Sequence, residues 1–219
     1  MEQVTKIVFK DYYRELFKWL LYISIFLVVI RITVYVVSYF NEESSLSHFL
    51  SFTMDPMSIG MMILGIISIY GFLPQSIKLG ATRKAFYLGI VYTVLALTIS
   101  YAVLNLILTA TEYAVVQRFT IESIALSDIW HYLITLFLSF LFGMIIALAY
   151  YRYGWKVGLV LTLVFITTRE AIEVLAADLF DHLFGASYYL LGSSLGDIML
   201  IGLLLWLCYR MIRDVPIKM

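Results

Sequence analysis

Residues 129–151 read IWHYLITLFLSFLFGMIIALAYY, a run of apolar side chains without a Lys, Arg, Asp or Glu. A helix needs roughly 20 such residues to cross about 30 Å of hydrocarbon. The run is apolar throughout and does not alternate at every second residue as the strands of a membrane barrel do. This stretch therefore predicts a membrane-spanning α-helix.

Five further apolar runs accompany it, and most of them reach the same length. The six predicted spans are residues 19–40, 57–72, 86–109, 129–151, 157–175 and 195–211. The chain has 63% hydrophobic and only 14% charged residues, which leaves no room for a sizeable soluble domain. We therefore expect an all-α fold: a polytopic membrane protein with six transmembrane helices in a single domain, residues 1–219.

The charged residues between the runs change sign from one loop to the next. The basic segments hold Lys6, Lys10, Arg14, Lys18, Lys78, Arg83, Lys84, Arg152, Lys156, Arg210, Arg213 and Lys218. The acidic loops hold Glu42, Glu43, Asp55, Glu112, Glu122, Asp128, Asp178 and Asp181, with Arg118 among them. Because Lys and Arg are retained in the cytoplasm, both termini are predicted to be cytoplasmic. The basic residues form no single patch, so no nucleic-acid partner is expected.

Before the first run, residues 1–18 repeat basic and apolar positions with a helical period. The two sets are Lys6, Lys10, Arg14 and Lys18 on one face and Val4, Val8, Tyr12 and Leu16 on another. Such spacing is typical of an amphipathic helix that lies in the membrane interface, here the cytoplasmic one. The alternative is a long, charged start to the first span. Asp11 and Glu15 favour the interfacial helix, because carboxylates enter hydrocarbon only at high cost.

The connection between the second and third spans, LPQSIKLGATRKAFYLG at residues 73–89, contains the strongest functional signal. Pro74 is expected to break the outgoing helix, Gly80 to allow a turn, and Thr82 to cap a new short helix that opens with Arg83 and Lys84. A structural explanation competes with this one, since tight loops between spans commonly use Pro and Gly and cytoplasmic loops are basic. On physical grounds alone the structural explanation comes first.

With its span count, its N-terminal helix and an element of the form Gly-x-Thr-Arg-Lys-x-Phe-x-x-Gly, the chain resembles the membrane subunit of a bacterial ABC exporter. The class includes drug, polysaccharide, lantibiotic-immunity and antimicrobial-peptide exporters. In that family the element forms a coupling helix, which seats in a cleft of the ATP-binding subunit and transmits its closure to the spans. The matching residues are Gly80, Thr82, Arg83, Lys84, Phe86 and Gly89.

The resemblance implies a permease in the bacterial cell membrane, working as a homodimer or beside a related permease subunit. The cargo it implies is a peptide or another amphipathic or hydrophobic substrate. The chain contains no Gly-x-x-x-x-Gly-Lys-Ser/Thr phosphate loop, so a separate ATP-binding cassette subunit would bind ATP. This chain is accordingly expected to be no enzyme and to bind no cofactor. The alternative is a non-energised immunity or sensor-anchoring protein that binds a peptide in the bilayer.

A second group of candidate residues lies inside the predicted spans. At 1.5 Å per residue, Arg31, Glu170 and Asp197 share one depth, roughly 21 Å from the cytoplasmic side. An unpaired ion there costs at least about 2.5–3.5 kcal/mol. Arg31 is therefore predicted to pair with Glu170 or Asp197, and Arg169 and Glu173 flank the same level. Two interpretations stay open: a structural ion-pair network among the helices, or a polar gate on a translocation path.

No metal site or catalytic constellation is predicted. His48, His131 and His182 all fall near the outer face, and no two of them have the spacing of metal ligands. The single cysteine, Cys208, lies near the cytoplasmic end of the last span and is interpreted as a small apolar packing residue.

Overall fold

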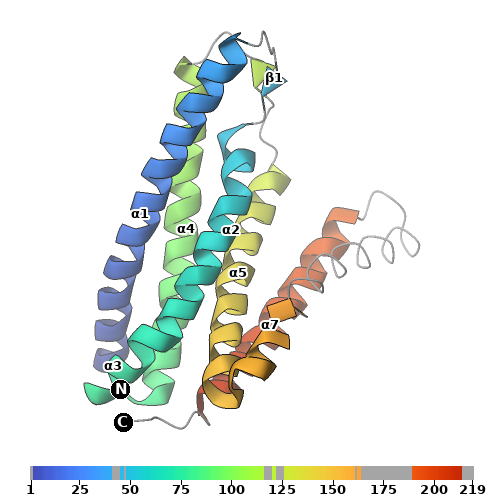
Figure 1. Ribbon diagram of the computed structural model, residues 1–219. Helices are drawn as coiled ribbons and strands as arrows, with labels where there is room; N and C mark the ends of the chain where they lie inside the picture. Colours follow the sequence, from blue (N-terminus) through green and yellow to red (C-terminus); the bar gives the residue numbers. More distant parts are fainter. Residues whose placement is uncertain are drawn as a thin grey trace. The chain divides into compact units, whose positions relative to one another are not determined.

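The computed structural model describes residues 2–40, 45–46, 48–115, 120–121, 126–160, 162–163 and 189–213. The elements are α1 (Glu2–Phe40), α2 (Phe49–Ile67), the π-helical segment η1 (Ser68–Phe72), α3 (Leu73–Lys78), α4 (Arg83–Val115), α5 (Leu126–Tyr153) and α7 (Tyr189–Arg213) (Figure 1). Residues 155–160 are also helical. Two short strands, β1 (Ser45–Leu46) and β2 (Thr120–Ile121), pair in parallel. The described residues are thus almost entirely helical, as expected.

Four helical segments are long and apolar enough to cross a membrane: residues 5–40, 49–78, 83–114 and 126–153. They cover the first four predicted spans. Helix α7 covers the predicted sixth span, whereas most of the fifth, 157–175, lies outside the described residues. These lengths and compositions are in keeping with a multi-pass membrane protein. The count of six spans and the cytoplasmic placement of both termini stay predictions.

The chain divides into two compact units. The first unit comprises residues 1–61 and 88–137, and the second comprises residues 62–87 and 138–219. Helices α2, α4 and α5 each pass from one unit into the other.

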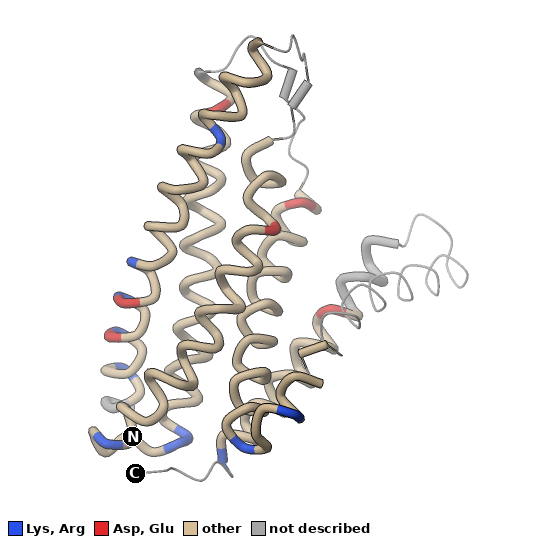
Figure 2. Tube along the Cα trace, viewed as in Figure 1, with Lys and Arg blue, Asp and Glu red and all other residues tan. Residues whose placement is uncertain are grey.

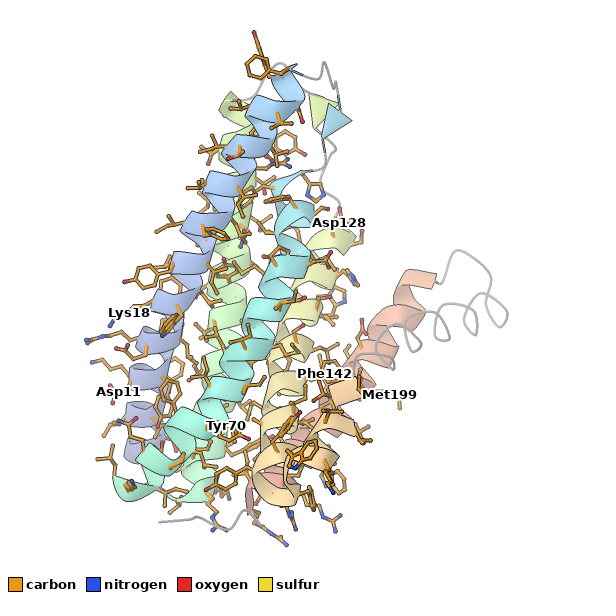
Figure 3. The ribbon with its side chains drawn as sticks, viewed as in Figure 1. Asp11, Lys18, Tyr70, Asp128, Phe142 and Met199 are labelled. Carbon is orange, nitrogen blue, oxygen red and sulfur yellow. The ribbon has the colours of Figure 1, made fainter. Side chains whose placement is uncertain are left out.

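Helix α1 differs from the expectation in its N-terminal half. Residues 2–40 form one uninterrupted helix, so no turn near residue 18 separates an interfacial helix from a first span. The predicted apolar face does exist, because Val8, Tyr12 and Leu16 are buried, while Lys18 projects away from it (Figure 3). That face is covered by protein instead of acyl chains. The prediction of a separate interfacial helix at residues 1–18 was therefore wrong, and the alternative of a long, charged start to the first span describes the structure.

In the first unit, α1 and α4 run parallel (Figure 1). Near their N-terminal ends, a Cβ on Gly89 would lie 2.6 Å from Cγ1 of Val8, so only glycine allows this approach. Further along, the hydroxyls of Ser24 and Tyr101 hydrogen-bond to each other. A parallel course is what alternating spans require of the first and third helices. The contact explains why the apolar face of α1 is buried.

In the second unit, α2 and α5 touch backbone to backbone. A Cβ on Gly65 would lie 2.2 Å from the carbonyl oxygen of Phe140, and a Cβ on Gly143 would lie 2.0 Å from that of Met62. Real Cβ atoms do not approach an oxygen so closely, so both positions require glycine. Small residues allow membrane helices this kind of contact, which gains dispersion energy along both backbones.

Candidate functional site

The turn between α3 and α4, residues 79–82, is held by backbone hydrogen bonds. The N–H groups of Gly80 and Ala81 donate to the carbonyls of Ile77 and Ser76, each over 2.9 Å. Gly80 has a φ of +85°, a left-handed conformation that favours glycine. The hydroxyl of Thr82 accepts a hydrogen bond of 3.2 Å from the N–H of Ala85, which caps α4. The turn at Gly80 and the cap at Thr82 are therefore both present as predicted.

Pro74 does not break the outgoing helix, contrary to the prediction. The helix widens into η1 immediately before it, and the N–H of Leu73 donates to the carbonyl of Ser68, five residues back. In a regular α-helix the proline ring would clash with the carbonyl of Tyr70, four residues earlier. Widening the turn relieves that clash, and the helix continues through Pro74 to Lys78.

The helix that opens at Arg83 is also longer than predicted. It is the start of α4, which continues for 33 residues to Val115, and no separate short helix follows the turn. The short helix of the connection is instead α3, which precedes the turn. Residues 83–115 contain no proline that would stop the helix, and Gly89 and Asn105, whose residue types can end a helix, both lie inside it.

The six residues of the predicted coupling element fall into two groups by exposure. Gly80, Thr82 and Lys84 are exposed, and Arg83 is half-buried. Phe86 is fully buried and Gly89 packs on Val8 of α1, so these two residues serve the packing of α4. Leu79, which no sequence argument singled out, is 80% exposed at the tip of the turn. Leu79, Gly80, Thr82 and Lys84 are hereafter called the exposed turn.

The start of α4 is tied to the end of α7 within the second unit. The guanidinium of Arg83 donates a hydrogen bond to the carbonyl oxygen of Arg213. One turn further on, the hydroxyl of Tyr87 donates to the carbonyl of Leu205 over 2.9 Å. The rings of Tyr87 and Tyr209 also pack, with centroids 5.3 Å apart. The exposed turn is therefore followed by a helix that is fixed from its first residue.

The basic residues of the second unit gather at the same end as this turn (Figure 2). Those that the structure describes are Lys78, Arg83, Lys84, Arg152, Lys156, Arg210 and Arg213. Among the described residues of this unit, Asp197 is the one acidic side chain. Such segregation is what the orientation rule produces on the cytoplasmic side of a membrane protein.

The first unit contains a buried ion pair near the other end of α1. Nε of Arg31 lies 2.8 Å from Oε1 of Glu112, and both side chains are about 95% buried. The hydroxyl of Tyr35 donates to the same carboxylate, and the N–H of Phe49 donates to its other oxygen over 2.9 Å. The Arg31 guanidinium also lies 5.1 Å above the ring of Phe52. Phe49 begins α2, so the helix dipole adds to the stabilisation of the carboxylate.

The partner of Arg31 is thus Glu112, in place of the predicted Glu170 or Asp197. Glu112 was assigned to an outer loop because the third span was predicted to end at residue 109, whereas α4 continues to Val115. Asp197 lies in α7 and belongs to the second unit. Arg169, Glu170 and Glu173 lie outside the described residues.

The described residues contain no group of three or more His, Cys, Asp or Glu side chains that could hold a metal ion. His48 is buried, and its Nε2 lies 3.8 Å from a carboxylate oxygen of Asp128. Its Nδ1 accepts a hydrogen bond of 3.1 Å from the N–H of Ser51 at the start of α2. The imidazole is therefore engaged in structural contacts at this helix end.

A scan against protein-family models, a search of curated proteins and a search of solved structures each gave no match.

Proposed function

We propose that the chain is the membrane-spanning permease subunit of a bacterial ABC exporter, energised by a separate ATP-binding subunit. The observation that carries this proposal is the exposed turn, which joins two membrane-length helical segments and is held rigidly at both of its ends. The resemblance of residues 80–89 to a coupling element adds to it.

A loop that transmits force must expose side chains to a partner and must also be stiffly joined to the spans. The turn meets the second requirement because its backbone is hydrogen-bonded to α3 and its far side is capped by Thr82. Helix α4 then runs without interruption for about 50 Å. Displacement of the turn would therefore move the whole of α4.

The first requirement is met by the chemistry of the turn. A large apolar side chain that is 80% exposed, Leu79, lies between the cations of Lys78 and Lys84. An exposed apolar residue with a charged rim is typical of a protein interface. The partner surface that fits it is a cleft with an apolar floor and acidic edges.

The buried pair of Arg31 and Glu112 has a structural role in this proposal. Both oxygens of the Glu112 carboxylate already accept hydrogen bonds from residues of the first unit.

The test is co-purification in mild detergent with an ATP-binding subunit from the native host. The double variant Leu79→Asp, Lys84→Glu places two carboxylates on the exposed turn. It is expected to reduce the amount of co-purified ATP-binding subunit at least about tenfold, because a buried unpaired charge at an interface costs 2 kcal/mol or more. Membrane insertion should be unchanged, since both side chains are exposed.

The matched control is Arg152→Glu, Lys156→Glu, which reverses two cations elsewhere at the basic end of the same unit and should leave co-purification intact. Equal loss in both variants would show a general charge effect and contradict the assignment to the turn. Reproducible absence of an ATP-binding subunit from the unmodified protein would favour the non-energised immunity or sensor-anchoring protein.

A further inference from the structure

One side of α1 is exposed along most of the helix. A set of exposed positions recurs there at alternate spacings of four and three residues, and it is hereafter called the α1 stripe: Asp11, Glu15, Lys18, Tyr22, Ile25, Val29, Ile32, Val36 and Tyr39. A pattern that repeats every seven residues keeps one side of a helix turned toward a partner helix. The α1 stripe is ionic from Asp11 to Lys18 and apolar or aromatic from Tyr22 onward.

The contacts of α1 with α4 show how deep the ionic end lies. Val8 meets Gly89 near one end of the two parallel helices, and Arg31 pairs with Glu112 further along. Both contacts join residues that are 81 positions apart in the sequence. The two helices therefore keep one register over this length.

Level with the ionic end of the stripe, α4 presents an apolar surface. In this register, residues 11–18 of α1 are level with residues 92–99 of α4. The well-exposed side chains of that part of α4 are Tyr92, Leu95 and Ile99. On α1 the continuous exposed apolar surface begins only at Trp19, eight residues beyond the level of Tyr92. At 1.5 Å per residue, the change from ionic to apolar surface is thus displaced by about 12 Å between the two helices.

Lipid is a poor cover for this ionic end. Charged side chains at the depth of acyl chains face protein or water-filled space. Lysine and arginine side chains can extend from such a depth to the headgroups, but the side chain of Asp11 is too short to do so. Asp11 and Lys18 both project from the exposed side of the helix (Figure 3). A partner that brings charges of its own would fit this surface better than acyl chains do.

The two edges of the ionic end carry opposite charges. At about 100° per residue, Lys10 and Arg14 lie to one side of Lys18, and Asp11 and Glu15 lie to the other. All five side chains are exposed, and Lys18 pairs with Glu15 over 2.9 Å. A two-fold axis between two parallel copies of this helix would place the cationic edge of each copy beside the anionic edge of the other.

We infer that the α1 stripe binds the α1 stripe of a second copy of this chain. Two copies of one membrane protein have the same orientation in the bilayer, so the paired helices are parallel, as the opposite edges require. Beyond the ionic end, the β-branched side chains of Ile25, Val29, Ile32 and Val36 form the apolar part of the seam. The inference rests on the proposed function for the need of a second permease subunit, and it names the face which that subunit covers.

The first test is disulfide cross-linking in native membranes, with Cys208→Ala as the background because Cys208 is the single cysteine of the chain. Ile25→Cys, in the middle of the stripe, should form a cross-linked dimer on mild oxidation. The matched control is Ile107→Cys on α4, which is nearly level with Ile25 and 58% exposed, against 62% for Ile25. The dimer fraction should be at least about fivefold higher for Ile25→Cys, since a disulfide forms only between closely apposed positions.

The second test reverses one edge at a time. Lys10→Glu, Arg14→Glu makes both edges acidic, and Asp11→Lys, Glu15→Lys makes both edges basic. Combined with Ile25→Cys, each variant alone should lose most of its cross-linking, because like charges then meet across the axis. Expressed together with different tags, the acidic and the basic variant should cross-link to each other at about the original level. This rescue also shows that both variants fold.

Equal cross-linking at Ile25 and Ile107 would leave the stripe to lipid and overturn the inference, as would reversed variants that cross-link alone as well as together. Labelling of Ile25→Cys by a membrane-impermeant maleimide without cross-linking would assign the stripe to a water-filled path and refute the dimer. Failed cross-linking of a chain that still co-purifies with an ATP-binding subunit would refute this interface alone. A cross-linked dimer without that subunit would support the interface and count against the exporter.

Discussion

Arg31 and Glu112 show how a buried charge determines the structure around it. The carboxylate accepts hydrogen bonds from Arg31, from Tyr35 and from the N–H of Phe49, so three segments of the first unit meet at one side chain. The guanidinium lies over two aromatic rings, 4.9 Å from the centre of Tyr35 and 5.1 Å from that of Phe52. A fully partnered pair such as this one is costly to break on one side only.

Glu112→Ala is expected to destabilise the protein by roughly 3–5 kcal/mol, because it leaves the Arg31 cation buried without its carboxylate. The double variant Arg31→Met, Glu112→Met should recover most of that loss. The measurement is the free energy of unfolding in detergent micelles. Asp55→Asn, at an exposed position of α2, removes one negative charge as a control and should change the free energy by less than about 0.5 kcal/mol. Equal destabilisation by the single and double variants would contradict the pairing.

The sequence indicated that Arg31 needs a partner but not which one. Thr109, Thr111 and Glu112 look like the beginning of a polar loop, so hydropathy ends the span before them. In the structure the hydroxyls of Thr109 and Thr111 donate to the carbonyls of Asn105 and Ile107, four residues back. The hydroxyl groups of both threonines thus find their hydrogen-bond acceptors within the helix. Hydropathy does not take such hydrogen bonds into account, so the end of this helix was predicted six residues too early.

At the scale of the helix, the contact of α2 with α5 depends on two glycines. The apolar runs predicted both helices, but glycine within a run carries no information about which neighbour it touches. Gly65 and Gly143 were therefore missed, although a small residue inside a span is the usual signal for close helix packing.

The predicted helix break at Pro74 was wrong for a different reason. The expectation that proline breaks a helix holds for regular α-helical geometry, and the wide π-helical turn of η1 departs from that geometry.

Gly143→Ala should destabilise the second unit, because its Cβ would overlap the Met62 carbonyl oxygen and force the two backbones apart. Overpacking of this kind costs typically about 1–3 kcal/mol, and more when the obstacle is backbone. The midpoint of thermal unfolding in detergent is the measurement. Gly202→Ala is the matched control, since its Cβ meets nothing within 4 Å, and it should be neutral or slightly stabilising. Similar losses for both variants would show that helix packing at Gly143 is not the cause.

For the whole molecule, the separation of charge predicts how the chain lies in the membrane. The basic end of the second unit holds Lys78 and Lys156, whereas Asp55, within α2, and Asp128, in the first turn of α5, belong to the first unit. Hydropathy was enough to predict four helical segments of membrane length, and each observed segment contains the predicted span. They could not predict the partners across helices, because lipid-facing and protein-facing apolar residues look alike in one sequence.

Single cysteines at these four positions test the orientation. In intact cells a membrane-impermeant maleimide should label Asp55→Cys and Asp128→Cys, and it should label Lys78→Cys and Lys156→Cys only after permeabilisation. All four side chains are at least partly exposed, so reactivity reports the side of the membrane. The native Cys208 is fully buried and is replaced by alanine to remove any background. Labelling of Lys78→Cys in intact cells would refute the predicted orientation.

The π-helical segment before Pro74 lets one helix contain a proline without a break. Pro74 has no N–H to donate, and the wide turn of η1 keeps its ring clear of the Tyr70 carbonyl. The helix is therefore mechanically continuous across its proline. A load applied at Leu79 would be carried along this helix instead of being absorbed by a hinge at Pro74.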